Sequence, residues 1–99
     1  MSYQYHFLDA AQLDYEEAVK WYLQRSHKAA NGFVASVEET LRLICNNPNR
    51  WKNEYANFHE LGVKKYPYSL VYTIETEMQR VIITAVFHGK RMPLNKYIV

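Results

Sequence analysis

The chain is 99 residues long and 48% hydrophobic, with three Gly, three Pro and one Cys. This length suits one domain, residues 1–99, because single domains commonly run from about 50 to 200 residues, and the composition excludes a disordered chain. The single Cys45 excludes an internal disulfide framework. The formal charge is +2, and residues 51–99 carry the basic excess, with seven Lys/Arg against four Asp/Glu. Such an excess is too small to indicate a dedicated nucleic-acid binder.

The first residues, MSYQYHFLDAAQ, have neither the basic region nor the apolar stretch of a signal peptide. No run approaches the roughly 18 apolar residues of a membrane span. We therefore expect a cytoplasmic protein that does not associate with a membrane. No Cys/His spacing of a zinc site occurs, and nothing in the sequence suggests a metal or an organic cofactor.

The N-terminal segment alternates aromatic and polar residues. Tyr3, Tyr5 and Phe7 recur at every second position, which predicts a strand over residues 3–8 with one buried face. Asp9 follows as a candidate N-cap, and Gln12 stands three residues later, as in a capping box. A helix is therefore expected to start here.

Two amphipathic helices are predicted next. The first ends near Ser26, and its apolar face consists of Ala11, Tyr15, Ala18, Val19 and Tyr22. The second begins near Lys28, and its apolar side consists of Phe33, Val37, Leu41 and Ile44. It stops at the sequence NNP, because Pro48 disfavours helical geometry at the residue before it. The short link between the helices predicts a helical hairpin.

The second half of the chain has the period of strands. Residues 49–58, NRWKNEYANF, show no period and are interpreted as a connection, whereas strands are predicted from His59, through residues 69–74, and over RVIITAVF. The last run is continuously apolar, which is typical of a central strand covered on both faces. The predicted order is β-α-α-β-β-β, an α+β fold in which the helical hairpin packs on one face of a mostly antiparallel sheet.

Four stretches carry a resemblance to a known family: LDYEEAVKWYLQRS, NNP, KKYPYSLVYTIE and VIITAVFHGKRMP. Together with the element order, they resemble the RelE/ParE superfamily of type II toxin-antitoxin toxins, and the ParE branch more than the RelE branch. The resemblance implies a small toxin silenced by a cognate antitoxin, whose extended or helical C-terminal segment wraps it. A hetero-oligomer with the antitoxin is a family expectation.

Two activities are known in the superfamily, and fold alone does not choose between them. RelE-type members cut mRNA on the ribosome, whereas ParE-type members poison DNA gyrase. This chain has Glu60 and Gly62 where the RelE branch carries lysines, and Ser69 where it carries an arginine, although Arg91 and Tyr97 fall where that branch keeps its C-terminal Arg and Tyr. We expect a gyrase poison that is not itself a catalyst. The alternatives are a metal-independent mRNA endoribonuclease acting on the ribosome, and a non-toxic member that only binds antitoxin.

A nuclease would need specific groups. Arg91 would clamp a phosphate, Tyr97 would donate a proton, and Lys64 or Lys65 would add a cation, since alternating strand positions send these two lysines to opposite faces. His88 is a lesser candidate, because a histidine titrates near neutral pH but no partner base is evident beside it.

The surface that binds a target or partner is predicted at the end of the last strand. Gly89 permits a tight turn and Pro93 redirects the chain, so the loop between them presents charge on a rigid platform. The candidate binding residues are Lys90, Arg91 and four aromatic residues in or beside connections, Trp51, Tyr66, Tyr68 and Tyr97.

Overall fold

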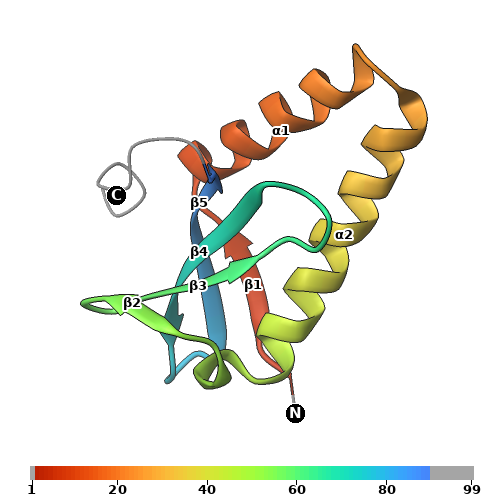
Figure 1. Cartoon of the computed structure of the whole chain (residues 1–99). Coiled ribbons are helices and arrows are strands. Elements are labelled where there is room, and N and C mark those ends of the chain that lie inside the picture. The colour runs from red at the N-terminus through yellow and green to blue at the C-terminus, as the bar shows by residue number, and fades with distance from the viewer. Residues whose placement is uncertain (1, 90–99) are drawn as a thin grey trace.

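The computed structural model describes residues 2–89. The elements, in chain order, are β1 (Gln4–Phe7), α1 (Asp9–Leu23), α2 (His27–Asn46), the 3₁₀ helix η1 (Pro48–Arg50), β2 (Asn53–Tyr55), β3 (Phe58–Gly62), β4 (Tyr68–Glu75) and β5 (Arg80–His88). The strands form one sheet in the order β1-β5-β4-β3-β2 (Figure 1). β1 runs parallel to β5, and all other neighbouring strands are antiparallel. The predicted α+β class and mostly antiparallel sheet are confirmed.

The helix boundaries differ from the prediction by a few residues. The N-cap of α1 is Leu8, which makes no side-chain capping bond, so the predicted Asp9 cap was wrong. Asp9 is instead the first helical residue, where its carboxylate complements the positive end of the helix dipole. The side chain of Gln12 donates to Glu16 (3.1 Å) rather than closing a capping box. Ser26 ends no helix: it is the N-cap of α2, and its hydroxyl accepts from the first helical turn (3.2 Å).

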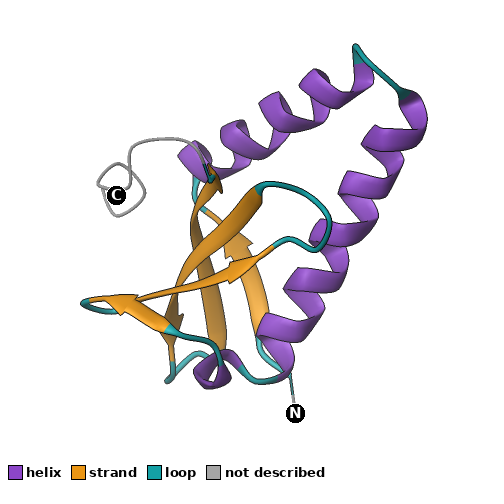
Figure 2. Cartoon of the chain, in the orientation of Figure 1, coloured by secondary structure: helices purple, strands orange, loops and turns teal. Residues whose placement is uncertain are grey.

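The helical hairpin covers one face of the sheet (Figure 2). The predicted apolar faces of both helices pack on the sheet, and the buried core cluster consists of Ala11, Ala18, Phe33, Val37, Leu41, Ile44, Cys45, Val63, Leu70, Tyr72, Val81, Ile83 and Val86. Tyr72 is fully buried, and its hydroxyl donates to the Pro48 carbonyl (2.6 Å), which ties β4 to the start of η1. No helix within residues 2–89 is both long and apolar enough to cross a membrane.

β5 has the position that its composition predicts. It lies inside the sheet between β1 and β4, and residues 81–87 are all buried. Val81 and Ile83 belong to the core under the helices, while Ile82 and Thr84, on the alternate positions, are also largely buried. The strand therefore passes from buried residues to the molecular surface at His88, its last residue.

The predicted connection over residues 49–58 is partly structured, so the prediction was wrong in part. It contains the last two residues of η1 and all of β2, a three-residue strand that pairs with β3 through an irregular register. Ala56, in the turn between them, has a left-handed φ of 49°. The sheet therefore has five strands among the described residues, one more than the sequence predicts.

Candidate functional site

The exit end of β5 is fixed by its pairing with β4. His88 stands opposite Tyr68 in the ladder, and the two rings meet edge to face at 5.0 Å. One residue later the Gly89 amide donates to the Pro67 carbonyl (2.8 Å). The chain that leads toward the predicted basic segment is therefore held on a rigid sheet. Lys90, Arg91 and Tyr97 themselves lie outside the described residues.

An aromatic groove adjoins this exit. A cavity of about 330 Å³ is lined by Trp21, Tyr22, Pro67, Tyr68 and His88. A second cavity, of about 160 Å³, shares Trp21 and Tyr68 with the first and adds acidic side chains of α1, its full lining being Asp14, Glu17, Ala18, Trp21, Tyr68 and Val86. Burial raises the pKa of Tyr22, with its tyrosine neighbours adding to the effect, so this phenol stays protonated near neutral pH. The surroundings of His88 are therefore aromatic.

Trp21, which lines both cavities, is in contact with Arg25, and sequence reasoning missed this pair. The guanidinium carbon of Arg25 lies 3.6 Å from the centroid of the Trp21 ring, and its Nη1 donates to the Trp21 carbonyl (2.9 Å). Trp21 is nevertheless 48% exposed. The available signal was the i, i+4 spacing of a Trp and an Arg beside the apolar helix stripe.

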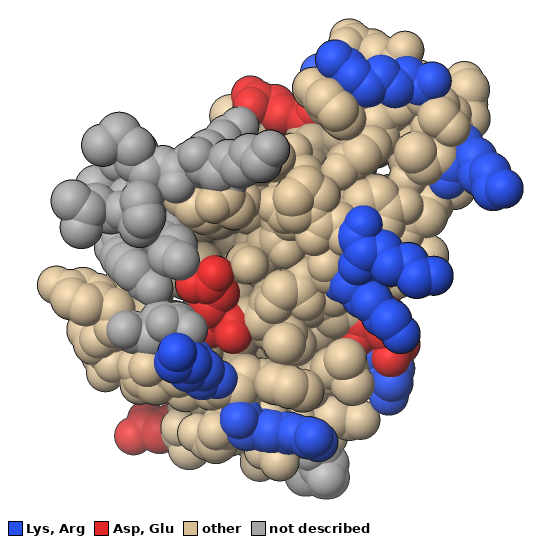
Figure 3. Space-filling view, in the orientation of Figure 1, with Lys and Arg blue, Asp and Glu red and all other residues tan. Residues whose placement is uncertain are grey.

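Lys64 and Lys65 lie in the turn between β3 and β4, so their predicted placement on opposite faces of a strand was wrong. β3 ends at Gly62, and Lys65 has a left-handed φ of 71°. The Lys64 carbonyl accepts from the hydroxyl of Ser36 on α2 (2.9 Å). Both lysine side chains are exposed, at the end of the sheet where Gly89 meets the same turn. Figure 3 shows that basic side chains gather along the side of the molecule formed by α2.

The predicted binding aromatics within residues 2–89 are half-buried and contact the core. Tyr66 donates its hydroxyl to the Ala29 carbonyl (3.0 Å), and Trp51 donates its indole N–H to the Leu43 carbonyl (3.3 Å). The ring of Tyr68 lies 5.2 Å from that of Phe33. Each therefore has a structural role, and its part in binding stays a prediction.

Three sheet positions singled out in the sequence, Glu60, Gly62 and Ser69, come together in the structure. Glu60 and Gly62 share one face of β3, and Gly62 pairs directly with Ser69 on β4. A Cβ atom on Gly62 would lie 4.0 Å from Ser69 Oγ. A carboxylate, a glycine and a serine thus occupy neighbouring positions on this part of the sheet.

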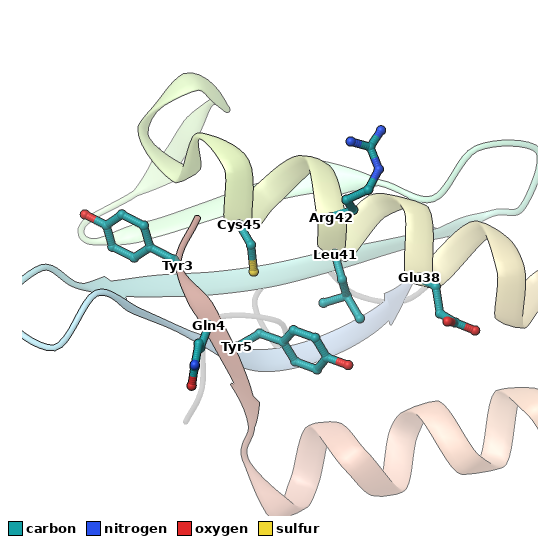
Figure 4. Close-up of a pocket in the computed structure, with 7 residues that line it drawn as sticks. All are labelled: Tyr3, Gln4, Tyr5, Glu38, Leu41, Arg42 and Cys45. Atoms are coloured by element: carbon teal, nitrogen blue, oxygen red, sulfur yellow. The ribbon is translucent and has the colours of Figure 1, made fainter. Parts of the chain in front are cut away.

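A separate groove lies between β1 and α2 (Figure 4). Its volume is about 500 Å³, and it is lined by Tyr3, Gln4, Tyr5, Glu38, Leu41, Arg42 and Cys45. The amide of Tyr3 donates to the Cys45 carbonyl (2.8 Å), which fixes one end of the groove. Sequence reasoning did not find this groove, because its two walls are about 35 residues apart in the chain.

Within residues 2–89, no group of three or more His, Cys, Asp or Glu side chains could hold a metal ion. His59, for example, hydrogen-bonds through Nδ1 to the Trp51 carbonyl (2.9 Å), and its ring stacks on that of Tyr72 at 5.2 Å. Its position is thus explained by contacts within the fold.

Solved structures with a similar arrangement of helices and strands identify the fold of this chain. The chain superposes on a chain of the chromosomal ParDE TA system from P. aeruginosa with a TM-score of 0.74 and 13% identity, over 90% of this chain and 98% of that one. For the isolated E. coli RelE toxin the TM-score is 0.64 and the identity 14%, over 95% and 92% of the chains. For a chain of the RelBE2 toxin-antitoxin complex from Mycobacterium tuberculosis the TM-score is 0.59 and the identity 22%, over 89% of this chain and 99% of that one. The fold is therefore that of the RelE/ParE toxins.

The sequence assigns the family within that fold. Residues 5–93 match the model of the family described as ParE toxin of type II toxin-antitoxin system, parDE. The chain belongs to this family, and it is a type II toxin-antitoxin toxin of the RelE/ParE superfamily, as its motifs predict. No curated protein sequence matches it.

Proposed function

We propose that this toxin poisons DNA gyrase and is neutralised by a cognate antitoxin. The observation that carries the proposal is the composition of the sheet at Glu60, Gly62 and Ser69, together with the match to the ParE family. The resemblance to the RelE branch would place two lysines and an arginine at these positions. The ParE branch, by contrast, is the one whose members act on gyrase.

The chemistry of mRNA cleavage explains why these three positions matter. Attack of a 2′-hydroxyl on a phosphate develops negative charge, which cationic side chains stabilise. A carboxylate at Glu60 repels that charge, and neither Gly62 nor Ser69 supplies a cation. Lys64 and Lys65 lie in the following turn, and His88 packs its ring against Tyr68. This arrangement supports binding to a target better than bond cleavage.

The proposed contact with gyrase is the segment that leaves β5. Lys90 and Arg91 follow Gly89, whose amide is bonded to Pro67, so the segment starts from a fixed point. An arginine offers paired donors for a carboxylate or a phosphate, and both groups are present in a complex of gyrase with DNA. The aromatic groove at Trp21 and Tyr68 adjoins this point and adds apolar contact area.

The test is a supercoiling reaction with purified gyrase, to which the antitoxin-free, refolded chain is added. We expect supercoiling to be inhibited and double-strand breaks to accumulate, because a poison traps the cleaved complex. The proposal is overturned if folded protein that is toxic in cells has no effect on gyrase. Cleavage of mRNA on ribosomes would then identify the nuclease alternative, and a lack of toxicity on expression without antitoxin would identify the non-toxic one.

Two variants localise the effect. Arg91→Ala is expected to abolish inhibition of gyrase, whereas Arg80→Ala, at the other end of β5, is expected to retain it. Arg80 is a suitable control because it forms an exposed ion pair with Glu75 (2.8 Å), and such pairs contribute only about 0–1 kcal/mol to stability. Tyr97→Phe separates the mechanisms. It keeps the aromatic ring predicted to take part in binding, so a gyrase poison keeps its toxicity, but a nuclease that uses the phenol as an acid loses it.

A further inference from the structure

We propose that a polar cavity between η1 and the strands β2, β3 and β4 binds one nucleotide of single-stranded nucleic acid. Hydrogen-bonding side chains in the cavity hold the base, while Arg50 and Lys52 beside it hold the phosphates. This inference goes beyond the proposed function, because it concerns what the free chain binds and does not depend on an action on gyrase.

The cavity lies at the end of the sheet opposite the exit of β5. Its volume of about 480 Å³ is within the range typical of sites for small ligands. Thr73 and Ile74, which line it, pair with residues near the start of β5, whereas His88 is the last residue of that strand. The lining comes from five segments of the chain: Asn49 in η1, Asn53 in β2, Asn57 in the turn after it, His59 in β3, and Thr73 and Ile74 in β4. The cavity is therefore separate from the aromatic groove.

The hydrogen-bonding groups of the cavity fit the edge of a nucleobase. Asn49, Asn53 and Asn57 each offer a carboxamide, which both donates and accepts, and Thr73 adds a hydroxyl. None of the described residues that line the cavity carries a carboxylate, an ammonium or a guanidinium group. Base edges likewise combine donors and acceptors without formal charge, and a carboxamide pairs with adenine through two hydrogen bonds. The described lining therefore matches an uncharged polar ring.

His59 contributes an acceptor in a fixed orientation. Its Nδ1 lies 2.9 Å from the Trp51 carbonyl oxygen, and its ring stacks on that of Tyr72 at 5.2 Å. A carbonyl oxygen only accepts, so Nδ1 carries the proton, and the Nε2 atom of the neutral ring is an acceptor. Asn53 pairs with His59 in the β2–β3 ladder, so their side chains are neighbours on one face of the sheet. An acceptor beside a carboxamide suits the amino group and the ring nitrogen that adenine carries side by side.

Two cations flank the cavity, which favours a nucleotide over an uncharged sugar or peptide. Arg50 follows Asn49 and Lys52 precedes Asn53, so each cation is next in sequence to a lining residue, and both side chains are exposed. The guanidinium carbon of Arg50 lies 4.9 Å from the centroid of the Trp51 ring. The backbone of Lys52 is fixed to β3, because its carbonyl accepts from an amide of that strand (3.2 Å). A base in the cavity therefore has cations beside it for its phosphates, and it must be unpaired to enter.

The test measures binding of labelled oligonucleotides of about 12 nucleotides to the full-length, antitoxin-free chain by fluorescence anisotropy. DNA and RNA strands of one mixed sequence are compared, each with a strand of the same length that carries abasic sites in place of its bases. We expect a Kd of roughly 10–100 μM for the better-bound strand, which identifies the source of the nucleotide. The corresponding abasic strand is expected to bind at least fivefold more weakly. Equal binding of the abasic strand, or no binding of any strand at about 200 μM chain, overturns the inference.

Three variants and a matched control locate the site. Asn49→Ala and Asn57→Ala each remove a carboxamide from the cavity, so the affinity should fall at least fivefold while its salt dependence stays unchanged. Arg50→Ala removes a phosphate contact, so the slope of log K against log salt should become shallower by about 0.7. Asn31→Ala, at an exposed position of α2 outside the cavity, should bind as the parent does. Cavity variants that bind as tightly as Asn31→Ala overturn the inference, and the abasic strand, tested on the parent chain, decides it if a cavity variant does not fold.

Discussion

Gly32 lies against the hydroxyl of Tyr66. Whether Gly32→Ala stabilises or destabilises the protein is therefore expected to depend on the residue at position 66. Gly32 lies inside α2, where alanine is ordinarily more stable by about 1 kcal/mol. A Cβ atom at this position, however, would overlap with the Tyr66 hydroxyl, far inside van der Waals contact. That hydroxyl is held by its bond to the Ala29 carbonyl (3.0 Å), and the ring packs against Tyr22 and Phe33 at 5.3 Å each. The ring has little room to retreat.

The expected free energies follow from these contacts. In the parent chain, Gly32→Ala gains about 1 kcal/mol of helix propensity, but it loses about 1 kcal/mol of hydrogen bond and about 1–3 kcal/mol of packing. The net result is destabilisation by about 1–3 kcal/mol. When Tyr66→Phe has removed the hydroxyl, the nearest ring atom is Cζ at 3.7 Å, an ordinary contact. Gly32→Ala is then expected to stabilise the protein by up to about 1 kcal/mol.

Urea unfolding of the four proteins, followed by circular dichroism, measures both effects in one double-mutant cycle. Tyr66→Phe alone should cost about 1 kcal/mol, the value of its hydrogen bond. The sign reversal is the decisive result, since an effect of helix propensity alone is the same in both backgrounds. If Gly32→Ala stabilised the parent chain as much as it stabilised the Tyr66→Phe chain, the close approach described above would be refuted.

Three further predictions concern the stability of the protein and depend on Tyr72 and Ser26. Tyr72→Phe should destabilise the protein by about 1–3 kcal/mol in urea unfolding, because the buried Pro48 carbonyl loses its donor. Burial raises the pKa of Tyr72, so the folded state holds this proton more tightly than the unfolded state. The free energy of unfolding should therefore fall as the pH rises above about 10, where an unfolded tyrosine ionises, and it should fall less steeply in Tyr72→Phe. Ser26→Ala should cost about 1 kcal/mol because α2 loses its N-cap acceptor, while Ser26→Asp, which also caps, should retain stability; a thermal melt of both variants checks this.

The buried faces of the helices and strands were predictable because they depend only on how apolar residues are spaced along each element. The helical stripe through Phe33, Val37, Leu41 and Ile44 and the apolar run of β5 are buried as expected. Such patterns report which side of an element meets the core, and that information is local in the sequence. The same reasoning predicted the sheet, since three strands joined by short turns pair in an antiparallel manner.

The errors in the predicted strands lie at turns where a residue other than glycine has a left-handed φ. Ala56, Lys65 and Gln79 all have left-handed φ values of 49–71°, and each lies in a turn between two strands. Sequence reasoning expects Gly or Asn at such positions. Without that signal, the turn at Ala56 concealed β2, and the turn at Lys65 was interpreted as a continuation of β3. The placement of Lys64 and Lys65 was wrong for this reason.

The candidate site was predictable only in part, because its components are distant in the chain. His88 and the end of β5 follow from one apolar run, but the aromatic groove also needs Trp21 from α1 and Pro67 from the β3–β4 turn. The comparison of Glu60, Gly62 and Ser69 gained a physical meaning only when the register put Gly62 beside Ser69. Periodicity does not specify register between strands, so this contact was not available from the sequence.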